Sequence, residues 1–81
     1  MQVRVLAFAR LRDLFGFGER RVDCAPGATL DDLWSGLAAN RAELLALRDS
    51  TRFACNGALA AGSAVLADGD EVAFLPPVGG G

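Results

Sequence analysis

The sequence predicts an α+β fold, in which a mixed sheet packs on one main helix. Several short segments alternate apolar and polar residues as strands do, and one central segment carries apolar residues at helical spacing. With 81 residues, 52% of them hydrophobic, the chain can build one core. We therefore expect one domain over residues 1–76 and a flexible glycine-rich tail over residues 77–81.

The first strand is expected at residues 2–9, QVRVLAFA, which are rich in β-branched and aromatic side chains. Strand alternation puts Val3, Val5, Ala7 and Ala9 on one face and Arg4, Leu6 and Phe8 on the other. Because Arg4 is charged, the second face is expected to meet solvent at one end. Phe8 is then a partly exposed aromatic residue.

A short helical turn follows in ARLRDLFG and ends at Gly16 and Gly18. The next segment, ERRVDC over residues 19–24, alternates like a second strand. Pro26 and Gly27 then break the chain.

The main helix has a clear start signal. Thr29 is the expected N-cap, with Asp32 in the capping-box position and Asp31 beside it. The apolar residues Leu30, Leu33, Trp34, Leu37 and Ala38 then follow at helical spacing. This pattern predicts an amphipathic helix whose apolar face, Trp34 included, covers a sheet.

The second half of the chain predicts three more strands. A helical stretch, RAELLALR, ends near Asp49, and TRFACN is typical of a third strand. Asn56-Gly57 is a strong signal for a type I′ turn, so residues 58–60 should pair back as a fourth strand.

The turn sequence ADGD leads into the last strand, EVAFL over residues 71–75. This strand must stop at Pro76, because proline has no N–H to donate. The resulting order fits a β-grasp, with the first and last strands side by side at the sheet centre and one face left open.

Composition excludes several classes of function. The net charge is −2 with a pI of about 4.8, and the eight arginines form no basic stripe, so we expect no nucleic-acid partner. The chain has no lysine, histidine or tyrosine, which removes the usual acid–base and Schiff-base residues. We therefore expect no bound cofactor or metal, and catalytic side chains supplied by other proteins.

Cys24 and Cys55 could form a disulfide, a metal pair or two buried thiols. Each falls on the apolar side of a predicted strand, with no CxxC spacing and no histidine, which favours buried thiols. Charged residues interrupt the apolar start, so we expect no signal peptide, no membrane partner and a cytoplasmic location.

The last ten residues, VAFLPPVGGG, combine a strand, a stiff exit and a thin tail. Pro76 and Pro77 restrict the direction in which the chain leaves the sheet. Gly79, Gly80 and Gly81 span about 10 Å when extended and have no Cβ to obstruct a narrow channel. The α-carboxylate of Gly81 becomes a good acyl donor only after activation, for example as an acyl-adenylate.

FARLRDLFG and DGDEVAFLPPVGGG resemble the small subunit of molybdopterin synthase, the MoaD family of ubiquitin-like sulfur carriers. The FxPPVxGG pattern is matched by Phe74, Pro76, Pro77, Val78, Gly80 and Gly81. Two positions depart from the family: Gly79 stands where Thr or Ala is frequent, and Leu75 where a second aromatic is common.

The resemblance implies that a ubiquitin-activating-type adenylating enzyme uses ATP to adenylate Gly81, and that a sulfur donor enzyme makes the thiocarboxylate. It further implies that Gly79 and Gly80 enter the large subunit of molybdopterin synthase, where the sulfur passes to cyclic pyranopterin monophosphate. Two carriers on a dimer of large subunits form a heterotetramer. The chain itself is then a non-catalytic, sulfur-donating subunit.

A partner surface is expected beside the tail. Strand alternation puts Glu71, Ala73 and Leu75 on the face opposite Val72 and Phe74. We assign the interface to Phe8, Leu59, Leu75, Pro76, Pro77 and Val78, positions to which the resemblance also points. The alternative is that Phe8 and Leu75 are core residues and the predicted faces are reversed. Arg12 is either a contact to a partner's acidic residue or an ordinary solvated arginine.

Two other functions remain open from the sequence. A carrier of the same fold could serve thiamine or cysteine synthesis, although the PPV before the glycines favours molybdopterin synthase. A ubiquitin-like interaction module with an inert tail is the third alternative, and it predicts that deletion of Gly81 has no effect.

Overall fold

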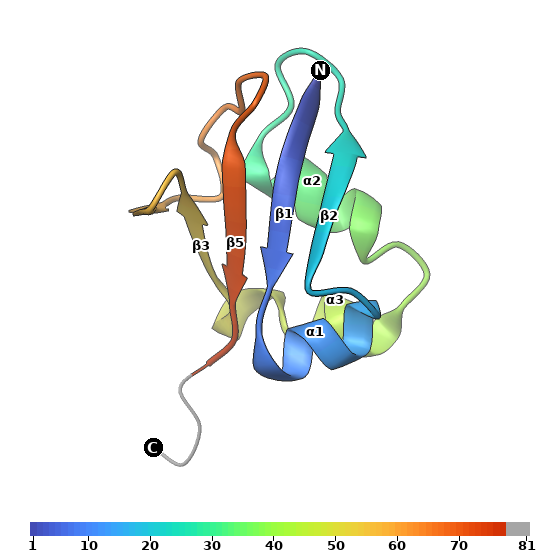
Figure 1. Ribbon diagram of the computed structural model, residues 1–81. Helices are drawn as coiled ribbons and strands as arrows, with labels where there is room; N and C mark the ends of the chain where they lie inside the picture. The colour runs from blue at the N-terminus through green and yellow to red at the C-terminus, as the bar shows by residue number, and fades with distance from the viewer. Residues whose placement is uncertain (78–81) are drawn as a thin grey trace.

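The computed structural model describes residues 1–77 as a five-stranded mixed sheet with its helices on one face and at one end (Figure 1). The elements are β1 (Gln2–Ala7), α1 (Ala9–Phe15), β2 (Glu19–Asp23), α2 (Leu30–Leu37), α3 (Ala42–Ala46), the 3-10 helix η1 (Arg48–Ser50), β3 (Arg52–Cys55), β4 (Ala58–Ala60) and β5 (Glu71–Leu75). The strand order is β2-β1-β5-β3-β4. β1 and β5 pair in parallel at the centre, and the other pairs are antiparallel. The expected β-grasp arrangement is confirmed.

The first strand is shorter than predicted. β1 ends at Ala7, and Ala9 begins α1 with a φ of 49° instead of continuing the strand. The Phe8 carbonyl accepts the N–H groups of Leu11 and Arg12, which closes the first turn of the helix. Burial of Leu11 favours this early helix start, because the apolar side chain then reaches the core.

The main helix agrees with its signals. The Thr29 side chain accepts the Asp32 N–H, and the Asp32 carboxylate accepts the Thr29 N–H, so the capping box is complete. Leu30, Leu33, Trp34 and Ala38 are buried, whereas Leu37 is half-buried. The apolar face of α2 therefore covers the sheet as predicted.

The following helical stretch was predicted too long. Only residues 42–46 are α-helical, and residues 48–50 form a 3-10 turn. Leu44 is its one fully buried side chain, so a longer helix would gain little burial. Leu47 instead accepts the hydroxyl of Thr51 through its carbonyl at 2.8 Å, which turns the chain into β3.

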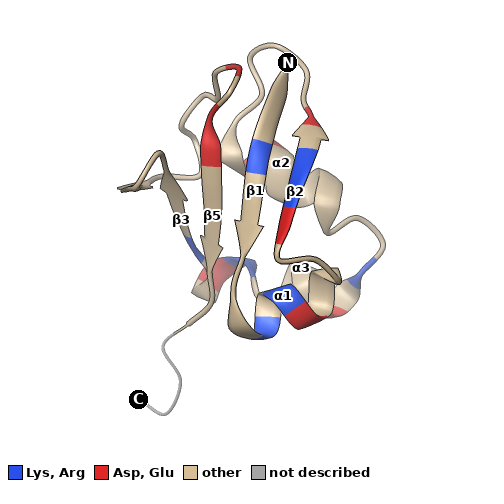
Figure 2. Ribbon diagram, viewed as in Figure 1, with Lys and Arg blue, Asp and Glu red and all other residues tan. Residues whose placement is uncertain are grey.

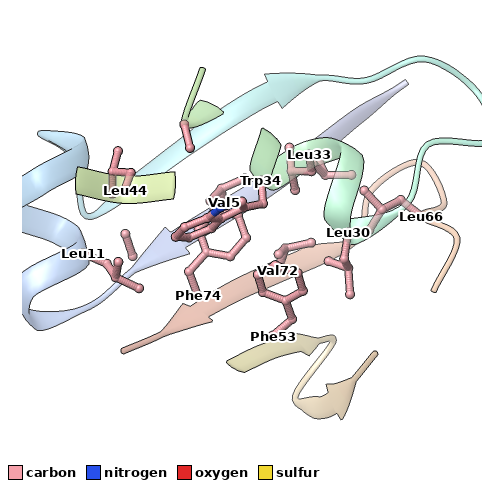
Figure 3. Close-up of a cluster of buried hydrophobic side chains, with 13 residues drawn as sticks. Val5, Leu11, Leu30, Leu33, Trp34, Leu44, Phe53, Leu66, Val72 and Phe74 are labelled. Atoms are coloured by element: carbon pink, nitrogen blue, oxygen red, sulfur yellow. The ribbon is translucent and has the colours of Figure 1, made fainter. Parts of the chain in front are cut away.

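Aromatic rings fill the space between the sheet and the helices (Figure 3). Trp34 meets Phe74 edge-on, with ring centroids 5.1 Å apart, and Phe53 lies 5.3 Å from Phe74. The indole N–H of Trp34 has no hydrogen-bond partner among the described residues, so Trp34 contributes through apolar contacts alone.

Two loops fix the start of β5. Asn56 and Gly57 have φ values of 51° and 85°, which confirms the type I′ turn. The Asn56 side chain donates to the Asp70 carboxylate and accepts the Glu71 N–H, both at 2.9 Å. This network ties the β3–β4 turn to the first residue of β5.

Both cysteines are free thiols, but they are half-buried rather than buried as predicted. They lie at the margin of the core, Cys24 just beyond β2 and Cys55 at the end of β3. Partial burial raises the pKa of both thiols, which makes them weak nucleophiles near neutral pH. Within residues 1–77, no helix is long and apolar enough to cross a membrane.

Candidate functional site

The face of the sheet opposite α2 carries a continuous row of apolar side chains. Leu6 of β1 pairs with Ala73 of β5, Ala73 pairs with Ala54 of β3, and Ala54 pairs with Leu59 of β4. Paired residues point to the same face, so these four side chains cross the sheet in one line. We call Leu6, Ala54, Leu59 and Ala73 the apolar band.

A second row lies where β5 ends. Leu75 pairs with Arg52, the first residue of β3. On the other side, Phe8 follows Ala7, whose partner in β5 is Phe74, so Phe8 lies level with Leu75. Phe8, Leu75 and Arg52 thus flank the point where the chain leaves the sheet, and we call them the exit row.

The exposure of these residues fits a surface rather than a core. Leu59 is 64% exposed and Phe8 45% exposed, while Leu75 is half-buried. Val72 and Phe74, on the other face of β5, are 0% exposed. The alternative in which Phe8 and Leu75 form the core is therefore wrong. Whether Phe8, Leu59 and Leu75 contact a partner stays a prediction.

The tail exit begins at Pro76, which is half-buried, and continues to Pro77, which is exposed. The last hydrogen-bonded residue of β5 is Leu75, as expected from the missing N–H of Pro76. The other predicted site residues, Val78, Gly79, Gly80 and Gly81, lie outside the described residues, as does most of the predicted tail segment.

Charged side chains flank the apolar band on the side that faces away from the tail exit. Arg4 of β1 bonds Glu19 at 2.9 Å and Glu71 at 3.3 Å across neighbouring strands. The hydrogen bond to Glu19 raises the pKa of Arg4 further above its ordinary value. Figure 2 shows this charged zone on β1, β2 and the first half of β5, and uncharged residues along the rest of β1 and β5. The uncharged part of β1 and β5 on the open face therefore lies at the end of the sheet where the chain exits.

The described residues offer little for side-chain chemistry. They contain no group of three or more potential metal ligands, and the two thiols have raised pKa values. Arg12 is exposed on α1 and forms no ion pair within residues 1–77. The arrangement is suited to docking another protein, with any transfer chemistry left to the tail.

Sequence reasoning missed Ala54 and Arg52 as members of this face. Strand alternation groups Phe53 with Cys55 and so places Ala54 and Arg52 together on the opposite side of β3. Their position beside Leu75 and Ala73 depends on the β3–β5 register, which pairs segments separated by about twenty residues and carries no local signal.

Comparison with known proteins adds independent information. The model of the ThiS family matches residues 5–81. The molybdopterin synthase sulfur carrier subunit of Escherichia coli (strain K12) is 41% identical over 81 residues, covering 98% of this chain and 99% of that protein. The protein of the same name from Chlamydomonas reinhardtii is 35% identical over 83 residues, covering 100% of both chains.

Solved structures show the same fold. SAMP1 from Haloferax volcanii, a small archaeal modifier protein, aligns with a TM-score of 0.83 and 31% identity over 100% of both chains. A chain in the complex of subunits 1 and 2 of the molybdopterin-converting factor from Helicobacter pylori aligns with a TM-score of 0.67 and 24% identity, again over 100% of both chains.

Proposed function

This chain belongs to the ThiS family, and from its curated relatives we propose that it is the sulfur carrier subunit of a molybdopterin synthase. The observation that carries the proposal is the 41% identity to the Escherichia coli sulfur carrier subunit over nearly the whole of both proteins. The apolar band and the exit row support it, because a carrier needs a docking surface next to the segment that it delivers.

The proposed reactive group is the α-carboxylate of Gly81. Attack of this carboxylate on ATP, in the active site of a separate adenylating enzyme, gives an acyl-adenylate and releases pyrophosphate. The outer sulfur of a donor persulfide then displaces AMP, and a thiol reduces the resulting acyl disulfide, which leaves a thiocarboxylate and a disulfide of the two thiols. In molybdopterin synthase this sulfur is passed to cyclic pyranopterin monophosphate.

In this scheme, the residues of the chain itself position the tail relative to the docking surface. The β5 strand is held in the sheet by β1 and β3, so the position of Pro76 is fixed relative to the apolar band. Docking through the band then directs the tail into the partner's active site. Proton transfers fall to the partner, since the chain has no histidine, lysine or tyrosine.

The main partner is proposed to be the large subunit of the synthase. The Helicobacter pylori structure is a complex of subunits 1 and 2 of the molybdopterin-converting factor, which supports an equivalent complex here. We further propose that two carriers bind a dimer of large subunits. The adenylating enzyme, its ATP and the sulfur donor enzyme complete the set of partners, and no cofactor resides on this chain.

Intact mass measurement tests the carrier function. The chain is incubated with the adenylating enzyme of the same organism, ATP and a sulfur donor. We expect replacement of one oxygen by sulfur at Gly81, and transfer activity with the large subunit and cyclic pyranopterin monophosphate. A variant lacking Gly81 is the control and should show neither. An unchanged mass with a demonstrably active enzyme would contradict the proposal.

The similarity to SAMP1 favours one second candidate, a covalent protein modifier. In that case, an amine of another protein would capture the activated Gly81. The chain has no lysine side chain with which to capture its own activated end. The same reaction, run without the large subunit in a mixture of host proteins, distinguishes the two, because only a modifier yields amide-linked conjugates that resist thiols.

A further inference from the structure

We propose that Arg52 and the groove beside it bind a carboxylate of the synthase large subunit, which fixes the docked carrier on the β3 side of the tail exit. This inference rests on the proposed function and adds a specificity-determining contact to it. It begins from the position of Arg52 in the exit row, directly across from Leu75, the last residue of β5. Figure 2 shows the basic start of β3 beside the end of β5.

Arg52 is exposed, and its charge is uncompensated within the described residues. Other arginines are already engaged there: Arg4 bonds Glu19 and Glu71, Arg10 bonds Glu43, and Arg48 bonds Asp31. Arg12, Arg20 and Arg21 also lack ion pairs in this part of the chain, but they belong to α1 and the edge strand β2. Within residues 1–77, Arg52 is therefore the arginine without an ion pair on a strand that adjoins β5.

A groove of about 440 Å³ lies next to Arg52, between η1 and the β3–β4 hairpin. Its walls include the apolar residues Phe53, Leu59 and Ala60, and no acidic residue lines it. The second cation in the wall, Arg48, is held by Asp31 at 2.7 Å and lies over the Phe53 ring at 4.1 Å. The uncompensated charge of Arg52 therefore favours an anionic ligand at the groove.

Continuity with the docking face identifies that occupant as part of a protein. Arg52 and Leu59 lie on the open face and form one rim of the groove, whereas Phe53 and Ala60 face the α2 side. A partner covering the apolar band therefore reaches the groove at its Arg52–Leu59 rim. A carboxylate next to an apolar side chain matches the mixed walls. A guanidinium binds a carboxylate through two parallel hydrogen bonds, which fixes orientation as well as position.

The carrier's own carboxyl end fits this groove less well. One exposed ion pair contributes too little binding free energy to hold a chain end by itself. A free multivalent anion is also disfavoured, because the described residues place one uncompensated guanidinium at the groove. A carboxylate of the docked partner is held close to Arg52 by the rest of the interface, so a single ion pair is sufficient to orient it.

The contact divides the exit row into two halves with different roles. Phe8 offers an apolar contact on the β1 side of the tail, and Arg52 a charged one on the β3 side. A charge at the edge of an interface mainly accelerates association and sets the orientation of docking. We therefore expect Arg52 to influence how fast, and in which register, the tail enters the large subunit.

Binding kinetics with the large subunit of the same organism test this inference. Arg52→Gln is expected to weaken binding about 5-fold, mostly through slower association, and Arg52→Glu about 20-fold or more. Arg52→Lys should retain part of the wild-type affinity, because lysine keeps the charge but cannot form the two parallel hydrogen bonds of a guanidinium. The salt dependence of association should be smaller for Arg52→Gln than for the wild type.

Arg21→Gln is the matched control. Arg21 is also exposed and free of ion pairs in the described chain, but it lies on β2 opposite Arg4, away from the exit. Its binding should stay within about 2-fold of the wild type. Arg52→Gln binding like the wild type, with the same salt dependence, overturns the inference and leaves the proposed function intact. A wild-type chain that does not bind the large subunit at all overturns both.

Discussion

The two faces of the central strands differ sharply although they alternate residue by residue. On the face covered by α2, Val5, Val72 and Phe74 are 0% exposed. On the open face, Phe8 and Leu59 are 45% and 64% exposed, and Leu6, Ala73 and Leu75 are half-buried. Both faces are apolar near the tail, but only one takes part in the core. Burial in the core is thus confined to one face of these strands, and our proposal assigns docking to the opposite face.

The sharpest test of this division exchanges one phenylalanine on each face. Phe74→Ala removes a ring that meets Trp34, Phe53 and Phe15 at centroid distances of 5.1, 5.3 and 5.7 Å. We expect a loss of about 3–5 kcal/mol in the free energy of unfolding, measured by urea denaturation. Phe8→Ala is the matched control and should change it by about 0.5 kcal/mol or less. Similar losses for both variants would contradict the division.

The converse test changes docking and spares the fold. Leu75→Glu puts a charge into the exit row, and we expect binding to the large subunit to weaken about 30-fold or more. The urea midpoint should move little, because Leu75 lies opposite the core. Leu45→Glu is the control: Leu45 is 48% exposed on α3, so the same change there should leave binding unaltered. Equal binding of the two variants would show that the open face is not the docking surface.

A third test concerns the ion pair between Arg48 and Asp31, which lies at the margin of the core. Gly62 lies so close to the Asp31 carboxylate and the Arg48 guanidinium that a Cβ there would collide with both. Gly62→Ala should therefore displace this ion pair. Because Arg48 is 31% and Asp31 53% exposed, we expect a loss of only about 0.5–1 kcal/mol in unfolding free energy.

The control for this change is Gly36→Ala, in α2, where a Cβ meets nothing within 4 Å. It should leave stability unchanged or raise it, since alanine is the better helix former. A Gly62→Ala variant as stable as the wild type would show that the ion pair contributes nothing measurable. Gly36→Ala should also leave binding through the apolar band unaltered, because Gly36 lies in α2, on the other side of the sheet.

Local signals predicted most of the fold, and non-local pairing explains what they missed. The capping box at Thr29 and the Asn56-Gly57 turn act within a few residues, and both were correct. The prediction that the first strand extends to Ala9 was wrong, because burial of Leu11 favours an early helix over a longer strand. Arg52 was overlooked as an exit residue because its place beside Leu75 exists only once β3 pairs with β5.

The smallest expected effect concerns the end of β5 farthest from the tail. The Ala67 N–H and then the Asn56 side chain lower the pKa of Asp70, because both bind its ionised carboxylate. A folded-state pKa below the unfolded value of about 3.9 means that ionised Asp70 stabilises the fold above that pH. This contribution is lost as the pH falls through the lower folded value.

Asp70→Asn removes the titration and should flatten the stability profile. We expect the wild type to exceed the variant in unfolding free energy at about pH 7, and the difference to shrink at about pH 3. Urea denaturation at the two pH values measures it, and a difference independent of pH would exclude the carboxylate as the cause. Since Asp70 and Asn56 fix the start of β5 while Leu75 and Arg52 lie at its end, binding at neutral pH should stay unchanged. Loss of binding in Asp70→Asn would show instead that the two ends of β5 are coupled. The position of the tail exit would then depend on the hydrogen bonds at the start of β5.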